Sequence, residues 1–192
     1  MNAVWLQVPE AFLEERRRLG HDKKDELWDG VLHMAPSPSG PHQRVSIDLL
    51  VALVPIARRL GLQYWADPTA IFGPGENWRI PDSVLARPEH ASERGLEGAE
   101  LVVEVLSPHD ESRAKLPWYA SVGVREVWLV EPRTRVVEVF ALCATTADPA
   151  VEVYVVVEPR DGAVTSPLLG VRLEVIAGPL LRIHDGSTQT DL

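Results

Sequence analysis

Apolar residues follow two different periodicities along the first sixty positions. The segment PEAFLEERRRLG, residues 9–20, begins with a proline suited to a first helical turn and ends at a glycine, which predicts a short helix. In ELWDGVLHM, residues 26–34, two apolar runs flank Asp29–Gly30, and such a pair is a strong hairpin signal. Apolar residues then recur at helical spacing from Gln43 to Leu60, which predicts a long amphipathic helix.

After Gly61 the pattern changes to short β-rich runs, many of them bounded by Gly, Pro or Asp. The expected strands are LQYWA, TAIFG, SVLAR, ELVVEVL, REVWLVE and RVVEVFAL, followed by residues 151–157 and 180–183. One helical segment is expected from about Glu111 to Val122, and the polar end HDGSTQTDL predicts a frayed terminus. This order favours a mixed-sheet α/β (α+β) fold. We expect one domain over residues 1–184 and a flexible tail at 185–192.

Composition and charge narrow the classes of partner and location. A formal net charge of −9 argues against broad, sequence-blind DNA binding, although a divalent cation makes a carboxylate site far less negative. The longest apolar stretch, LLVALVPIA, is too short to span a bilayer, and the N-terminus lacks a signal-peptide pattern, so no membrane association is expected. The single cysteine, Cys143, excludes an intramolecular disulfide, and we expect a cytoplasmic protein.

A carboxylate interrupts the most apolar of the expected strands. ELVVEVL has aliphatic residues at both odd and even positions, so both faces of this strand should be buried. Glu104 within it must be paired, bound to a metal or placed at a cleft, because an isolated buried carboxylate is costly. An ion pair with Arg113 or a hydrogen bond from a backbone amide would satisfy it as well, and Glu104 alone does not decide between these alternatives.

A second acid and a lysine are consistent with a site for a divalent metal ion. Asp82 follows Pro81, which cannot donate to a sheet ladder and therefore marks a strand start or an irregularity. Alone it would be an ordinary turn residue, but two carboxylates on adjacent strands form the oxygen-rich pocket that Mg²⁺ or Mn²⁺ prefers. Lys115 is one of three lysines in the chain, and a lysine near such a pair can orient a water or offset charge on a phosphoryl group.

Several motifs in order resemble the bacterial Uma-two family. They are WDGVLHMAPSPSGPHQRVSIDLL, RIPD, LVVEVLSP and K-x-x-x-Y-A-x-x-G-V-R-E-V-W-L-V-E-P, and they run from about Glu26 to Phe140. The family consists of restriction-endonuclease-like proteins with the PD-(D/E)xK nuclease fold. The resemblance implies a mixed central β-sheet flanked by helices, with an N-terminal helix and β-hairpin, and metal-dependent cleavage of DNA.

The acids and the lysine can be carried over from the family position by position. Asp82 matches the first acid of the family motif and Glu104 the second. The general pattern places a lysine two residues after the second acid, where this chain has Leu106. The family commonly supplies the lysine from the following helix instead, and Lys115, four residues before Tyr119, matches it.

Three further residues complete the expected site. His42 in SGPHQR matches a histidine that the family places at the mouth of the long helix, and Glu26 matches the glutamate of its hairpin. Either would hold a second metal or a water. The backbone carbonyl of Val105 is expected to join Asp82 and Glu104 as a ligand of Mg²⁺ or Mn²⁺.

The linker before Lys115 departs from the family. The segment from Pro108 to Lys115 is a few residues shorter than the resemblance leads one to expect, and Pro117 should disturb a helix unless it lies in the first turn. The triplet His109-Asp110-Glu111 is more simply a helix start than a metal site. These departures and the charge of −9 keep open a nuclease-fold binding or assembly module with weakened or lost catalysis.

The first hypothesis is therefore a Mg²⁺-dependent endonuclease that hydrolyses DNA phosphodiester bonds. The second is the non-catalytic module, and the third is a metal-dependent hydrolase of another phosphoester. A homodimer is expected, because the hydrophobic strands VVEVFAL and VEVYVVV could form an edge or interface and a two-fold enzyme suits the cleavage of two strands.

Overall fold

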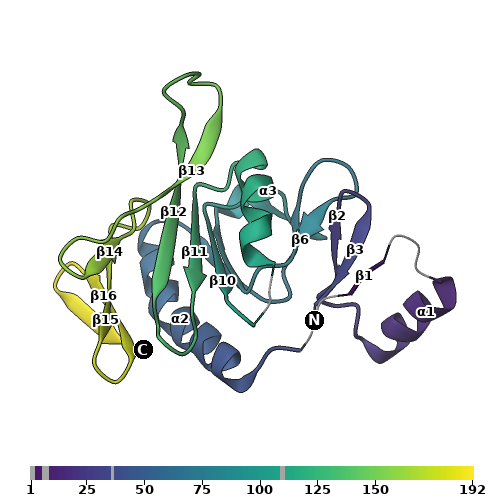
Figure 1. The fold of residues 1–192 in the computed structure, drawn as a ribbon, viewed down its shortest axis with the longest axis horizontal. Coiled ribbons are helices and arrows are strands. Elements are labelled where there is room, and N and C mark those ends of the chain that lie inside the picture. Colours follow the sequence, from purple (N-terminus) through teal and green to yellow (C-terminus); the bar gives the residue numbers. More distant parts are fainter. Residues whose placement is uncertain (1–2, 6–8, 36, 109–110) are drawn as a thin grey trace.

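A six-stranded mixed sheet forms the centre of the chain, with the strand order β13-β12-β11-β10-β7-β4 (Figure 1). The computed structural model describes residues 3–5, 9–35, 37–108 and 111–192. Strands β10 and β11 are parallel, and the other neighbours are antiparallel. The strands are β4 (Gln63–Ala66), β7 (Ser83–Ala86), β10 (Leu101–Val105), β11 (Glu126–Val130), β12 (Val137–Ala144) and β13 (Glu152–Val156). The predicted mixed sheet is confirmed.

Both faces of the central strands β10 and β11 are covered, as the apolar pattern of ELVVEVL predicts for β10. Helix α2 (Gly40–Arg59) packs on one face and helix α3 (Leu116–Ser121) belongs to the cluster on the other. Side chains alternate along β10, so that Val103 and Val105 join the apolar cluster of α2, whereas Val102 joins the cluster of α3. Alternation thus directs the side chain of Glu104, the next even-numbered residue of β10, toward α3.

An N-terminal sheet of seven short strands carries the predicted hairpin. Its order is β1-β3-β2-β6-β5-β9-β8. The strands are β1 (Ala3–Trp5), β2 (Glu26–Trp28), β3 (Val31–Met34), β5 (Ile71–Phe72), β6 (Trp78–Arg79), β8 (Ala91–Ser92) and β9 (Gly95–Leu96), with a 3-10 turn η1 (Pro88–His90) before β8. Helix α1 (Glu10–Leu19) precedes the hairpin as predicted. The turn at Asp29 and Gly30 has φ values of 49° and 84°, which are typical of the tight turns that match strand twist.

The two helix boundaries nearest the expected site differ from the sequence prediction. Helix α2 begins three residues before Gln43, because the Ser39 side chain caps it by accepting a hydrogen bond from the backbone amide of His42. The helix expected from about Glu111 is a 3-10 turn, η2 (Ser112–Lys115), followed by α3. Pro117 is the second residue of α3, where its missing N–H costs no intrahelical bond. His109 and Asp110 of the triplet lie outside the described residues.

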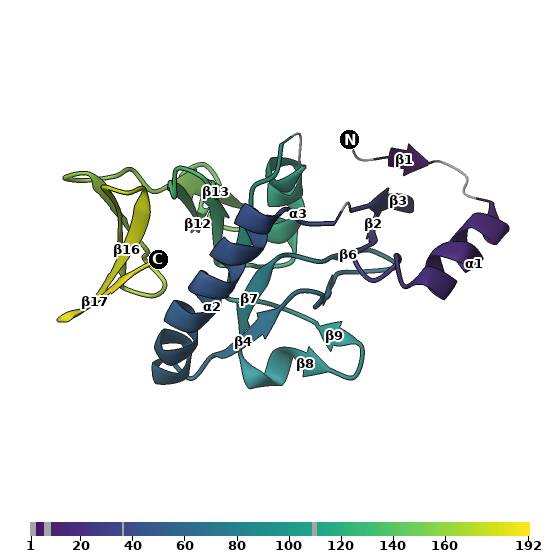
Figure 2. The same ribbon diagram turned by 90° about the horizontal axis from the view of Figure 1, so that it is seen from below.

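A third, antiparallel sheet contains the C-terminus. It consists of β14 (Ala163–Thr165), β15 (Arg172–Ile176), β16 (Leu180–Asp185) and β17 (Thr188–Asp191). Figure 2 shows this sheet at the opposite end of the molecule from α1. The last residues were expected to be frayed, but β17 pairs with β16, and Arg182 donates two hydrogen bonds of 2.7 Å to Asp191. Backbone pairing needs no apolar pattern, so the polar sequence gave no sign of this strand.

Strand β13 is an edge of the central sheet and carries exposed apolar side chains. Val153 and Val155 are 44% and 50% exposed. Whether two copies of the chain meet at this edge is not tested by the fold, and the homodimer stays a prediction. No helix in the described part of the chain is long and apolar enough to cross a membrane.

Candidate active site

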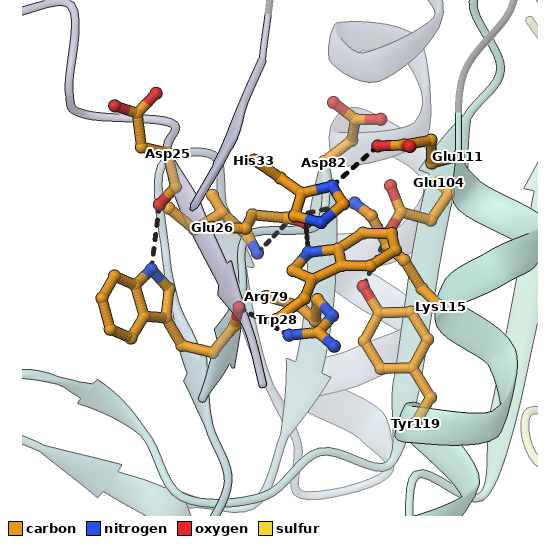
Figure 3. A network of polar contacts seen from close by, with 12 residues as sticks. Asp25, Glu26, Trp28, His33, Arg79, Asp82, Glu104, Glu111, Lys115 and Tyr119 are labelled. Atoms are coloured by element: carbon orange, nitrogen blue, oxygen red, sulfur yellow. Dashed lines mark hydrogen bonds and ion pairs between the residues drawn. The ribbon is translucent and has the colours of Figure 1, made fainter. Parts of the chain in front are cut away.

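A cavity of about 140 Å³ lies beside the adjoining ends of β7 and β10, next to the β2–β3 hairpin and the turn η2 (Figure 3). It is lined by every residue that the sequence placed in the expected site: Glu26, His42, Asp82, Glu104, Val105 and Lys115. These residues come from the hairpin, α2, two central strands and the turn before α3. The structure brings them together, while their catalytic and metal-binding roles stay predictions.

Strand register explains why Asp82 and Glu104 meet. Ser83 of β7 lies opposite Val103 of β10 in an antiparallel pair. Asp82 precedes Ser83 and Glu104 follows Val103, so the two acids occupy neighbouring positions at the same end of the pair. The backbone amide of Val105 donates a hydrogen bond of 2.8 Å to Oδ2 of Asp82, which fixes the first acid against the second strand.

Lys115 reaches this acid pair from the turn before α3. Its Nζ is 3.0 Å from Oε1 of Glu104 and 2.8 Å from Oε1 of Glu26. One turn later, the hydroxyl of Tyr119 donates a hydrogen bond of 2.6 Å to the same oxygen of Glu104. The shorter linker and the proline therefore leave the lysine beside the second acid, although the sequence position two residues after that acid is Leu106.

Burial and charge act in opposite directions on Glu104 and Lys115. Burial raises the pKa of Glu104, Lys115 lowers it, and the charges of Asp82 and Glu26 raise it again, giving a pKa of about 7. Burial alone would lower the pKa of Lys115, but Glu104 and Glu26 outweigh burial and raise it above its ordinary value. Lys115 is therefore a cation and a hydrogen-bond donor at neutral pH and not a general base.

Glu26 accepts hydrogen bonds from three neighbouring residues. Its Oε1 accepts hydrogen bonds from Nζ of Lys115 and from the backbone amide of Ile80, both at 2.8 Å. Its Oε2 accepts a hydrogen bond of 2.7 Å from Nε1 of Trp28. Because both oxygens are already engaged, this arrangement suits positioning of the lysine better than direct contact with a metal.

His42 holds the first acid from the side of α2. Its Nε2 lies 3.1 Å from Oδ2 of Asp82. Burial alone would lower the pKa of His42, but the hydrogen bond to Asp82 and the charge of that carboxylate outweigh burial and raise it. The Nδ1 atom of His42 is buried and has no hydrogen-bond partner among the described residues.

The structure adds an imidazole–carboxylate pair at the cavity that sequence reasoning missed. Nδ1 of His33 lies 2.9 Å from Oε2 of Glu111, and both residues line the cavity (Figure 3). The sequence could have predicted the position of His33. A hairpin closed by the two-residue turn Asp29–Gly30 places residue 33 opposite Glu26. Glu111 belongs to the triplet that was interpreted as a helix start. It does directly precede the turn η2, and its side chain also lines the cavity.

The donor set fits a magnesium ion held by two carboxylates. Oδ1 of Asp82 and Oε2 of Glu104 make no hydrogen bond to any described residue, and the backbone of Val105 lies beside them at the cavity wall. Within the described ranges, no three His, Cys, Asp or Glu side chains form a group that could hold a metal ion by themselves. Mg²⁺ keeps several waters and is usually bound through one or two carboxylates plus substrate oxygens, so two carboxylates suffice.

A mixed sheet with an acid pair and a lysine at adjoining strand ends defines a restriction-endonuclease-like fold. Residues 9–175 match the profile of the Uma2 family, described as "Putative restriction endonuclease". The chain belongs to this family, which confirms the resemblance seen in its motifs.

A solved structure from Anabaena variabilis ATCC 29413, described as a putative nuclease belonging to DUF820, shares the fold. Its TM-score is 0.59 at 19% sequence identity, and the match covers 82% of this chain and 90% of that one. No curated protein sequence matches the chain.

Proposed function

We propose that the protein is a Mg²⁺-dependent endonuclease that hydrolyses phosphodiester bonds of DNA. The observation that carries this proposal is the convergence of Asp82, Glu104 and Lys115 on one cavity. The family and the fold support the same class of activity. The metal and the DNA substrate are part of the proposal.

The expected site residues have separate roles in this proposed mechanism. Asp82 and Glu104, with the carbonyl of Val105, would hold the metal. Bound Mg²⁺ would polarise the scissile phosphate and lower the pKa of a bound water. Lys115, fixed by Glu26 at 2.8 Å, would orient the attacking water and offset charge on the phosphoryl oxygens.

The charge of the cavity supports the proposed requirement for a cation. Five acidic residues line it, against two lysines: Glu26, Asp67, Asp82, Glu104 and Glu111 against Lys24 and Lys115. A phosphate would be repelled from such a lining, and a divalent cation between the carboxylates removes much of that repulsion. We therefore expect DNA to be cleaved only when Mg²⁺ or Mn²⁺ is present.

A cleavage assay with paired variants tests the proposal. Supercoiled plasmid and single-stranded DNA are incubated with the wild type and with Asp82→Asn or Glu104→Gln, in Mg²⁺, in Mn²⁺ and in EDTA. Loss of one group that acts in the transition state is expected to slow cleavage by about 10²-fold or more. Glu93→Gln removes an exposed acid outside the cavity and should leave the rate unchanged. Equal rates in wild type and Glu104→Gln would reject the assignment.

A non-catalytic module is the second candidate. The specific observation in its favour is that Lys115 is engaged by two carboxylates, which neutralises it without a substrate. This candidate predicts no cleavage and no change in melting temperature on addition of Mn²⁺. The nuclease predicts that Mn²⁺ raises the melting temperature of the wild type but not of Asp82→Asn. Parallel assays with small phosphodiesters test the third hypothesis, a metal-dependent hydrolase that acts on a phosphoester other than DNA.

A further inference from the structure

We propose that His33 is a further catalytic residue, which protonates the leaving oxygen of the cleaved phosphodiester, and that Glu111 is its positioning residue. The inference rests on the proposed nuclease function and adds a role which that function leaves unassigned. It starts from the imidazole–carboxylate pair at the cavity wall, with 2.9 Å between Nδ1 of His33 and Oε2 of Glu111.

The hairpin directs His33 toward the cavity. Glu26 and His33 are directly opposite each other in the β2–β3 ladder, so their side chains lie on the same face. Glu26 holds Lys115 on that face, and His33 lines the same cavity with a side chain that is 13% exposed. The imidazole is thus sheltered but accessible from the space in which a phosphate would sit.

The orientation of the imidazole ring is fixed from two sides. The ring of Trp28 stacks on it with a centroid distance of 3.9 Å and an interplanar angle of 12° (Figure 3). Trp28 is itself held by its hydrogen bond to Glu26 and by the guanidinium of Arg79, 4.4 Å from its ring centroid. Glu111 engages Nδ1, so the ring offers Nε2 as its remaining nitrogen.

Phosphodiester hydrolysis requires a proton at the leaving oxygen. The attacking water forms a new P–O bond while the bond from phosphorus to the leaving oxygen breaks, and the electron pair of that bond stays on the leaving oxygen. In the proposed step the imidazolium Nε2–H gives its proton to this oxygen, which departs as an alcohol. The water's own proton passes to solvent, and His33 regains a proton from solvent, so charge and atoms balance.

The other donors of the cavity are less suited to this step. Lys115 is held by two carboxylates, and Nε2 of His42 faces Asp82. Nε2 of His33 makes no hydrogen bond to any described residue, so its proton is not committed elsewhere within the described structure.

A change of leaving group separates proton donation from a structural role. The products of the wild type first show which bridging oxygen leaves, and an oligonucleotide with sulfur at that position is then prepared. Sulfur leaves readily as a thiolate and needs no proton. His33→Gln is expected to slow cleavage of ordinary DNA by about 10²–10⁴-fold, the usual contribution of a general acid. On the sulfur substrate the variant should cleave at nearly the wild-type rate.

Glu111 provides a second, independent variant, because it is 32% exposed and its replacement should not prevent folding. Glu111→Gln should show the same selective defect on ordinary DNA, and Glu111→Asp should partly restore the rate. His21→Gln, which changes an exposed histidine outside the cavity, is the matched control. Equal defects on both substrates, or no defect on ordinary DNA, would overturn the role of His33 while leaving the nuclease proposal intact. A wild type that does not cleave DNA would remove the proposed function itself.

Discussion

Replacing Lys115 by Met removes the ammonium that pairs with two buried carboxylates while keeping much of the aliphatic stem. Its Nζ lies 2.8 Å from Glu26 and 3.0 Å from Glu104, and all three side chains are at most 11% exposed. For unit charges about 2.8 Å apart in an effective dielectric of about 20, the gross attraction is about 6 kcal/mol. Removal of one partner from a buried pair typically costs about 3–5 kcal/mol, and we expect Lys115→Met to lose that much unfolding free energy near pH 8.

The loss should depend on pH in a defined direction. Burial raises the pKa of Glu104 from an ordinary value of 4.5 to about 7, so this carboxyl destabilises the folded state as pH rises through that window. Without Lys115 the folded-state pKa rises further, and the penalty extends to higher pH. Near pH 4 the carboxyl of Glu104 is largely protonated in both folded and unfolded states, so the variant should lose less stability there than near pH 8.

Urea unfolding, followed by tryptophan fluorescence in EDTA near pH 4 and pH 8, measures this difference. Lys23→Met is the matched control, because Lys23 is exposed and does not line the cavity. The control should match the wild type at both pH values. A loss of less than about 1 kcal/mol for Lys115→Met near pH 8, the range of an exposed ion pair, would refute the reasoning, and so would an equal loss at both pH values.

Two further predictions concern stability away from the cavity. Glu126 is buried and accepts hydrogen bonds from Nε1 of Trp128, Oγ of Ser166 and the amide of Leu168. Glu126→Ala should cost about 2–4 kcal/mol in urea unfolding and Glu126→Gln less, and equal stability of all three proteins would contradict this. Gly95 has a φ of 147°, and a Cβ there would lie 2.6 Å from a backbone carbonyl oxygen. Gly95→Ala should cost at least about 1–3 kcal/mol, and an unchanged melting temperature would count against it.

The sequence predicted those parts of the fold that depend on local turn chemistry and strong apolar periodicity. The Asp29–Gly30 hairpin and the long helix α2 are examples. The strand β17 (Thr188–Asp191) was missed, because its polar residues are held by backbone pairing and by an ion pair to β16, neither of which leaves an apolar pattern. Boundaries set by a single cap, such as that of Ser39, were also missed.

The grouping of Asp82, Glu104 and Lys115 in one site was predicted from signals other than turn chemistry and apolar periodicity. Glu104 was conspicuous because a carboxylate in a doubly buried strand needs a partner, and the structure supplies Lys115 and Tyr119. The pairing of His33 with Glu111 depends on how the linker before α3 returns to the hairpin. That return joins residues 78 positions apart, and no local pattern encodes it.

The central claim is that Asp82 and Glu104 together hold the metal at which DNA is cleaved. Anomalous diffraction from a crystal of the wild type soaked in Mn²⁺ tests it most directly. We expect one strong peak between the two carboxylates, with Lys115 beside it, and loss of that peak in Asp82→Asn. A wild-type crystal without density between Asp82 and Glu104, or with Mn²⁺ bound only elsewhere, would contradict the account.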